Sequence, residues 1–184
     1  VDIDRFSKYA PVTKRKGLII TGRQVPYKRF DLAIAAAKKL NMPLSVIGNG
    51  SMHKKLVAQA AGHKNITFLT NVTDTELPKL LSKAELFVFP GVEDFGIAPV
   101  EAMAAGTPVV AYGEGGALDY VTDATGVLFH RQTADALADA IVTALGSKWD
   151  HKKIGKEVKK FNNNNFKKQF SAVVIEEFLH GEEA

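Results

Sequence analysis

Short apolar runs alternate with segments of helical periodicity along most of the chain. The run at 17–22, Gly-Leu-Ile-Ile-Thr-Gly, is apolar without alternation, which is typical of a strand buried on both faces. Five similar runs follow, so strands are predicted at residues 17–22, 44–48, 66–69, 86–90, 108–112 and 126–129. Between them, apolar side chains spaced three and four residues apart predict helices over about 30–40, 53–61, 74–81, 99–105 and 134–145.

This order of elements predicts the fold class. Strands that alternate with helices form a parallel sheet covered by helices on both faces. Right-handed crossovers then make the sheet doubly wound and Rossmann-like, with about six strands. In such α/β sheets ligands bind at the carboxyl ends of the strands, so the loops that follow the strands are where candidate chemistry is sought.

Three residues are expected to set helix boundaries. Asp74 is expected to cap the helix that follows it, and Pro99 to occupy the first helical position of the next one. Gly106 stands just past the predicted end of that helix, where glycine is favoured.

The last part of the chain has a different pattern. Eight lysines lie between residues 148 and 168, which favours a solvated helix face, with contact to an anionic membrane surface as the alternative. Asparagines at 162–165 form a turn that can cap a final helix. That helix carries apolar side chains at helical spacing, Phe166, Phe170, Val174 and Phe178. Packing on this domain is the simpler expectation, and packing against a missing domain is the alternative.

Composition narrows the class of protein. The chain has 184 residues, 46% of them hydrophobic and 24% charged, which suits one globular domain. The absence of cysteine excludes disulfides and thiolate chemistry. No signal peptide or membrane-spanning run is visible, and a cytoplasmic location is expected. The first residue is not Met, which suggests a fragment. The net charge of +4, without an aromatic platform, does not favour nucleic-acid binding.

Two early loops could hold an anion. Gly22, Arg23 and Lys28 follow the first predicted strand and precede a helix, and cations at a helix N-terminus suit a diphosphate. Two surface basic residues in a loop are the alternative. Asn49 and Gly50 follow the second strand, where the glycine lets a ligand approach the backbone. A dehydrogenase fingerprint would need its glycines after the first strand, so this loop does not favour a redox enzyme.

The loop after the fourth strand is the most specific segment. Glu93 lies in the loop and Glu101 in the following helix, with seven residues between them. The backbone N–H groups of Gly96, Ile97 and Ala98 stand just before that helix, so loop and helix together could grip the hydroxyls of a sugar. Taken singly, Glu93 could be an ordinary solvent-facing acid, and Glu101 could be explained by a favourable interaction with the helix dipole. Gly115 and Gly116, after the fifth strand, offer further backbone N–H groups or simply a flexible turn.

Together these loops resemble the donor-binding domain of retaining glycosyltransferases of family 4, which have the two-domain GT-B fold. The resemblance rests on Gly22-Arg23 with Lys28, on Gly48-Asn49-Gly50, on the E-x7-E pair Glu93 and Glu101, and on Gly115-Gly116. It covers about residues 1–145. The residues from Glu93 to Glu101 are most similar to a mannosyltransferase subgroup that uses GDP-mannose. Ser51 and Asp119 depart from the common pattern, which has proline and glutamate there.

The resemblance implies a role for each candidate. Arg23 and Lys28 would neutralise the donor diphosphate, Glu93 would contact the transferred sugar, and these three are the expected catalytic residues. Glu101 would bind the ribose hydroxyls. The remaining donor-binding candidates are Gly22, Asn49, Gly50, Asn71, Val72, Gly96, Ile97, Ala98, Gly115 and Gly116, with Asn71 and Val72 bordering the base.

The resemblance also implies a domain layout and a reaction. Residues 1–14 would be an interdomain connection, 15–147 the nucleotide-sugar-binding domain of a GT-B C-terminal half, and 148–184 a helical tail. The full enzyme would move mannose from GDP-mannose to a glycan or lipid-linked acceptor with retained anomeric configuration. No metal and no cofactor are expected, since no histidine pattern such as H-E-x-x-H occurs.

Acceptor binding would lie in a missing N-terminal domain, and the isolated chain is expected to be inactive. A location at the inner face of the membrane, as a peripheral protein, would suit a lipid-linked acceptor. Three alternatives remain open from the residues: an epimerase or phosphorylase of the same fold, a non-catalytic nucleotide-binding module, and, least favoured, a redox Rossmann enzyme.

Overall fold

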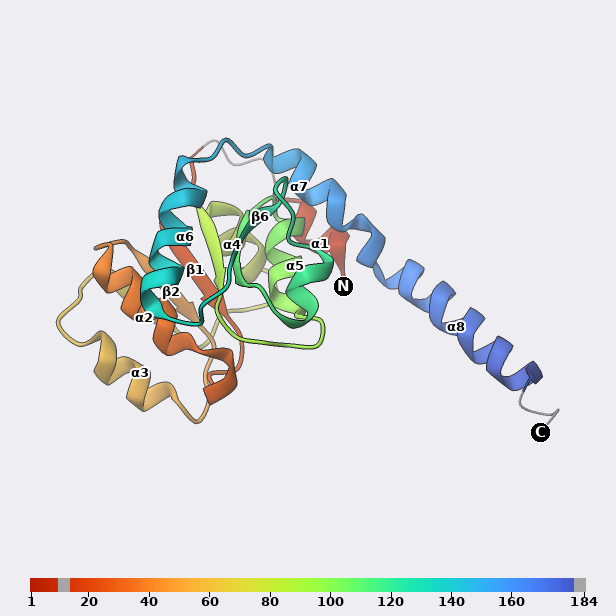
Figure 1. Cartoon of the computed structure of the whole chain (residues 1–184), viewed down its shortest axis with the longest axis horizontal. Helices are drawn as coiled ribbons and strands as arrows, with labels where there is room; N and C mark the ends of the chain where they lie inside the picture. The colour runs from red at the N-terminus through yellow and green to blue at the C-terminus, as the bar shows by residue number, and fades with distance from the viewer. Residues whose placement is uncertain (10–13, 181–184) are drawn as a thin grey trace.

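The computed structural model describes residues 1–9 and 14–180. Its centre is a sheet of six parallel strands in the order β3-β2-β1-β4-β5-β6 (Figure 1). The strands are β1 (Leu18–Thr21), β2 (Leu44–Ile47), β3 (Ile66–Leu69), β4 (Leu86–Phe89), β5 (Val109–Tyr112) and β6 (Gly126–Phe129). All six runs predicted from apolar patterning are therefore strands, and the Rossmann-like, doubly wound sheet is confirmed.

Each strand sends successive side chains to opposite faces of the sheet. In β1, Leu18 and Ile20 belong to one hydrophobic cluster and Ile19 to the other. In β4, Val88 and Phe87 divide in the same way. Because both faces are covered, both sets of side chains must be apolar, which is why these strands have no polar alternation in the sequence.

Helices form a layer on each face of the sheet (Figure 1). One layer consists of α2 (Phe30–Lys39), α3 (His53–Ala60) and α6 (Ala134–Gly146). The opposite layer consists of α1 (Ile3–Ser7), α4 (Leu77–Lys83), α5 (Ile97–Ala104) and α7 (His151–Glu157). Three short 3-10 helices lie in the connections, η1 (Pro26–Lys28), η2 (Gly115–Asp119) and η3 (Val158–Phe161).

Two of the three predicted helix boundaries are wrong. Thr73, not Asp74, begins the turn before α4, since its hydroxyl accepts from the Glu76 N–H while the Glu76 carboxylate accepts from the Thr73 N–H at 2.9 Å. The Asp74 carboxylate instead accepts from Arg5 at 2.9 Å. Helix α5 begins two residues before Pro99, at Ile97. The third boundary is confirmed, because Gly106 follows α5 with a φ of +76°.

The N-terminal residues pack on the domain. Ile3 and Phe6 of α1 are buried in the cluster beneath α4 and α5. The Arg5 guanidinium donates hydrogen bonds to the Asp74 backbone carbonyl as well as to its carboxylate. The amino group of Val1 donates to the Phe161 carbonyl at 2.9 Å. The segment expected to be an interdomain connection thus contains a helix that the sequence analysis did not predict.

The C-terminal segment divides into a packed part and a projecting part. Ile154 and Val158 are fully buried against the α5 layer. Helix α8 (Asn163–His180) then extends away from the domain, and the Asn162 side chain caps it by accepting from the Asn165 N–H. Its apolar side chains are exposed: Phe166, Phe170, Val173, Val174, Ile175 and Phe178. The simpler expectation, that this stripe packs on the domain, is wrong for these residues.

The lysines of the same segment are exposed, as a solvated face requires. Among the helices of residues 1–9 and 14–180, none is long and apolar enough to cross a membrane.

Candidate functional site

The main candidate site is a cavity of about 660 Å³ where the strand order reverses. Strands β1 and β4 are neighbours there, with Leu18 opposite Leu86, although the chain visits two other strands between them. The connections from β1 and β4 therefore leave the sheet in opposite directions and open a crevice at its carboxyl edge. Thr21 and Gly22 form one wall, and residues 92–98 with Glu101 form the other.

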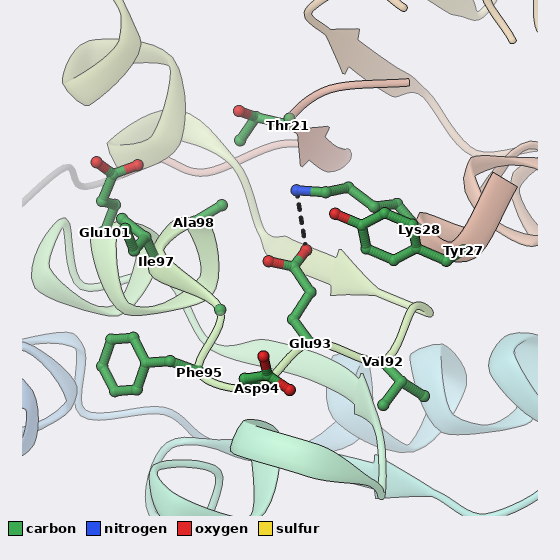
Figure 2. Close-up of a pocket in the computed structure, with 12 residues that line it drawn as sticks. Thr21, Tyr27, Lys28, Val92, Glu93, Asp94, Phe95, Ile97, Ala98 and Glu101 are labelled. Atoms are coloured by element: carbon green, nitrogen blue, oxygen red, sulfur yellow. Dashed lines mark ion pairs between the residues drawn. The ribbon is translucent and has the colours of Figure 1, made fainter. Parts of the chain in front are cut away.

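Lys28 enters the cavity from η1 and pairs with Glu93. The Lys28 Nζ lies 2.9 Å from the Glu93 Oε1, and the two side chains are 17% and 20% exposed (Figure 2). The neighbouring cation, Arg29, is turned elsewhere, because its guanidinium pairs with Asp31 and donates to Gln132. Of two adjacent basic residues, only Lys28 therefore reaches the site.

The loop that carries Glu93 is fixed at both of its ends. A side chain at Gly91 would lie 2.7 Å from the Lys28 Cα, so glycine lets this loop pass directly against η1. Gly96 has a φ of +84°, and a Cβ there would lie 2.6 Å from the Tyr120 hydroxyl. Between the two, the Glu93 carbonyl accepts from the Gly116 N–H at 2.9 Å. The pairing of Glu93 with Lys28 thus rests on a backbone with little freedom.

Helix α5 begins at the cavity wall with Ile97 and Ala98. The first N–H groups of any helix have no intrahelical partner, and no side chain of the described residues caps those of α5, so they favour an anion or a hydroxyl oxygen. Glu101 lies one turn further along, at the opposite end of the cavity from the ion pair (Figure 2). Burial raises its pKa from 4.5 to about 7, and the nearby Arg5 cation opposes this rise.

The loops after β1 and β2 hold three predicted residues outside the lining of this cavity. These residues are Arg23, Asn49 and Gly50. Arg23 and Asn49 are exposed, and the Asn49 side chain accepts a hydrogen bond from the Gly50 N–H. Gln24, which the sequence analysis did not select, joins these loops from a fully buried position. Its amide donates to the Gly48 carbonyl at 2.7 Å, and its carbonyl oxygen lies 2.8 Å from the His53 ring nitrogen.

Asn71 and Val72 line a second cavity, of about 530 Å³, beyond the carboxyl end of β3. Phe68, Leu69 and Leu80 give it apolar walls, and Glu76, Lys79 and Lys83 contribute charges. Gly115 and Gly116 also lie outside the lining of the main cavity, where they contact the backbone of residues 93–95.

The structure therefore brings seven of the predicted residues together in one cavity: Gly22, Lys28, Glu93, Gly96, Ile97, Ala98 and Glu101. Tyr120 was missed. Its ring is buried, and its hydroxyl is one of two buried polar groups without a hydrogen-bond partner among the described residues. Neither Gln24 nor Tyr120 carries a sequence signal of its own, since each acts through contacts with residues distant in the chain. In the described part of the chain, no three His, Asp or Glu side chains are grouped to hold a metal ion.

Two known proteins illustrate what this chain is similar to in sequence. A protein of Corynebacterium glutamicum, named GDP-mannose-dependent monoacylated alpha-(1-6)-phosphatidylinositol monomannoside mannosyltransferase, is 30% identical over 171 residues, covering 79% of this chain and 45% of that protein. A glycogen synthase of Mycobacterium tuberculosis is 33% identical over 150 residues, covering 76% of this chain and 36% of that protein. The chain thus spans less than half the length of either relative.

Among solved structures, the Anabaena HepE protein in complex with UDP shares the fold, with a TM-score of 0.74 at 20% identity, covering 96% of this chain and 56% of that one. The family model described as glycosyl transferases group 1 matches residues 2–164, which is most of the chain. The chain therefore belongs to the glycosyl transferases group 1 family.

Proposed function

We propose that this chain binds the nucleotide-sugar donor of a retaining glycosyltransferase. The observation that carries the proposal is the cavity at the switch point of the sheet, where the Lys28 cation, the Glu93 carboxylate and the uncapped start of α5 face one space. A cation and free N–H groups suit a diphosphate, and a carboxylate suits the hydroxyls of a sugar.

In this proposal each end of the cavity binds one part of the donor. Lys28, with Arg23 at the rim, neutralises the diphosphate and the charge that develops on it as the sugar leaves. Glu93 and the N–H groups of Gly96, Ile97 and Ala98 hold the transferred sugar. Glu101 accepts hydrogen bonds from the ribose hydroxyls.

The remaining loops would complete the donor site. Gly22, Asn49 and Gly50 let the diphosphate approach the backbone, and Gly115 and Gly116 support the loop that carries Glu93. Asn71 and Val72 border the base, for which the apolar walls of the second cavity are suited. No metal or cofactor is needed, because Lys28 and Arg23 supply the positive charge that the diphosphate requires.

We further propose GDP-mannose as the donor and a glycan or lipid-linked molecule as the acceptor. The name of the Corynebacterium relative supports this choice. The glycogen synthase relative and the UDP complex of the Anabaena protein make other donors the necessary comparison. The acceptor would bind to a further part of the protein, against which the exposed stripe of α8 would pack, and the chain alone would transfer little sugar. The exposed lysines beside that stripe would allow peripheral contact with an anionic membrane.

A thermal-shift panel tests the proposal. GDP, UDP and ADP, each with and without its sugar, are added to the chain, and we expect GDP and GDP-mannose to raise the melting temperature most. A ligand at a hundredfold excess over its dissociation constant stabilises the folded state by about 2.7 kcal/mol.

Lys28→Ala should abolish the shift, whereas Lys39→Ala should not. Lys39 is the matched control because it pairs with Asp135 on the surface, away from the cavity. No shift with any of the six nucleotides, or an equal shift in Lys28→Ala, would contradict the proposal.

A further inference from the structure

The main cavity is lined by more acidic than basic side chains. Among the described residues that line it, Glu93, Asp94 and Glu101 carry carboxyl groups, whereas Lys28 is the one basic residue. That cation is already engaged, because its Nζ lies 2.9 Å from Glu93. A diphosphate therefore meets a lysine whose charge is neutralised by a neighbouring acid.

We infer that Glu93 competes with the donor diphosphate for Lys28, so that this carboxylate selects the nucleotide sugar over the nucleoside diphosphate. The inference rests on the proposed function of the cavity and assigns Glu93 a second role within it. When a diphosphate binds, Lys28 exchanges its partner, and the Glu93 carboxylate is left without a cation.

The consequence for Glu93 depends on what the cavity holds. With a nucleotide sugar bound, the sugar hydroxyls donate hydrogen bonds to the carboxylate and replace the lost cation. With a nucleoside diphosphate alone, the carboxylate has only water as a partner and lies close to a second anion. The exchange therefore disfavours the product complex more than the substrate complex, and the ion pair re-forms as the product leaves.

The backbone around this pair explains why the carboxylate cannot simply move away. The Glu93 carbonyl is held by the Gly116 N–H, and Gly91 passes directly against η1. Both side chains are also largely buried, so water screens their interaction less than it screens a surface pair. Glu93 and Lys28 are thus held as neighbours.

Isothermal titration calorimetry with GDP and GDP-mannose tests the exchange. Glu93→Gln keeps the shape of the side chain but frees Lys28, so GDP should bind on the order of tenfold more tightly than to the wild type. GDP-mannose should gain less, because the amide is a weaker acceptor for the sugar hydroxyls. The preference of the wild type for GDP-mannose over GDP should therefore shrink.

Two further variants separate the exchange from a general charge effect. Asp135→Asn removes an equal charge from the Lys39 ion pair on the surface, and it should leave both affinities unchanged. A Lys28→Met variant should no longer bind GDP measurably, and adding Glu93→Gln should not restore binding, because no cation remains to be released.

The possible results are distinct. If the wild type binds GDP but Glu93→Gln binds it no more tightly, the exchange is refuted and the donor site stands. An equal gain for GDP and GDP-mannose would refute the selectivity. If neither the wild type nor Glu93→Gln binds either nucleotide, the assigned donor is wrong and the exchange fails with it.

Discussion

The buried carboxyl of Glu101 should make this domain less stable as the pH rises. Burial raises its pKa from 4.5 to about 7, so the folded protein holds the Glu101 proton more tightly than the unfolded chain. The resulting stabilisation is fully present below pH 4.5 and is lost as the pH rises through about 7. Glu101→Gln cannot ionise and should not show this loss.

The size of the effect follows from the two pKa values. The difference between 4.5 and about 7, at about 1.4 kcal/mol per pH unit, corresponds to about 3 kcal/mol. This is an upper value, because Glu101 keeps some contact with solvent at the cavity wall. For a domain of this length, 1 kcal/mol changes the melting temperature by about 2–4 °C. Glu101→Gln should therefore melt several degrees above the wild type at pH 8 and close to it at pH 5.

Differential scanning calorimetry of both proteins from pH 5 to pH 8 measures this difference. Groups that titrate alike in both proteins cancel, so the pH dependence of the difference reports Glu101 alone. Glu114→Gln is the matched control, because Glu114 is exposed. The difference in melting temperature between this variant and the wild type should be the same at pH 5 and pH 8. A Glu101→Gln difference that is the same at pH 5 and pH 8 would refute the reasoning.

Three other predictions concern the support of the site and its metal dependence. Gly96→Ala should lower the free energy of unfolding, measured in urea, by about 2 kcal/mol or more, because φ at Gly96 is +84° and the new Cβ would meet the Tyr120 hydroxyl. Adding Tyr120→Phe removes that hydroxyl and should restore part of the lost stability. Gln24→Leu should cost about 1–3 kcal/mol by the same measurement, because the Gly48 carbonyl loses its buried donor, and an unchanged midpoint would contradict this. Excess EDTA should leave the thermal shift with GDP unchanged, and a loss restored by Mg²⁺ would show that a metal takes part.

The strands were predictable because their environment is uniform. A strand buried on both faces has to be apolar throughout, as in β4, where all four residues are buried and lie within the predicted run at 86–90. Helix α1 was not predictable in this way. It has five residues, too few for a periodic pattern, and it is held by the burial of Ile3 and Phe6 against residues that lie far away in the sequence.

The candidate site was predictable in its residue types and less so in their placement. Strand ends converge in any parallel sheet, so Lys28, Glu93 and Glu101 were expected near one another. The ion pair between Lys28 and Glu93 depends on the path of two loops, and no residue type specifies that path. The position of Arg23 was likewise not predictable from its residue type. Its neighbour Gln24 is buried and donates to the Gly48 carbonyl, whereas Arg23 is exposed and does not line the cavity.

The two glutamates of the cavity differ in what balances their charge, and this difference makes their roles separable. Glu93 has a lysine within 3 Å, whereas burial is the largest influence on the pKa of Glu101. If ribose hydroxyls donate to Glu101, binding must favour its ionised form, and about half a proton should be released per GDP at pH 7, where the group is half ionised. Calorimetry in two buffers of different ionisation enthalpy measures that proton. Glu101→Gln should abolish the release, whereas Glu93→Gln should keep it while changing the affinity; release that survives Glu101→Gln would place the ribose elsewhere.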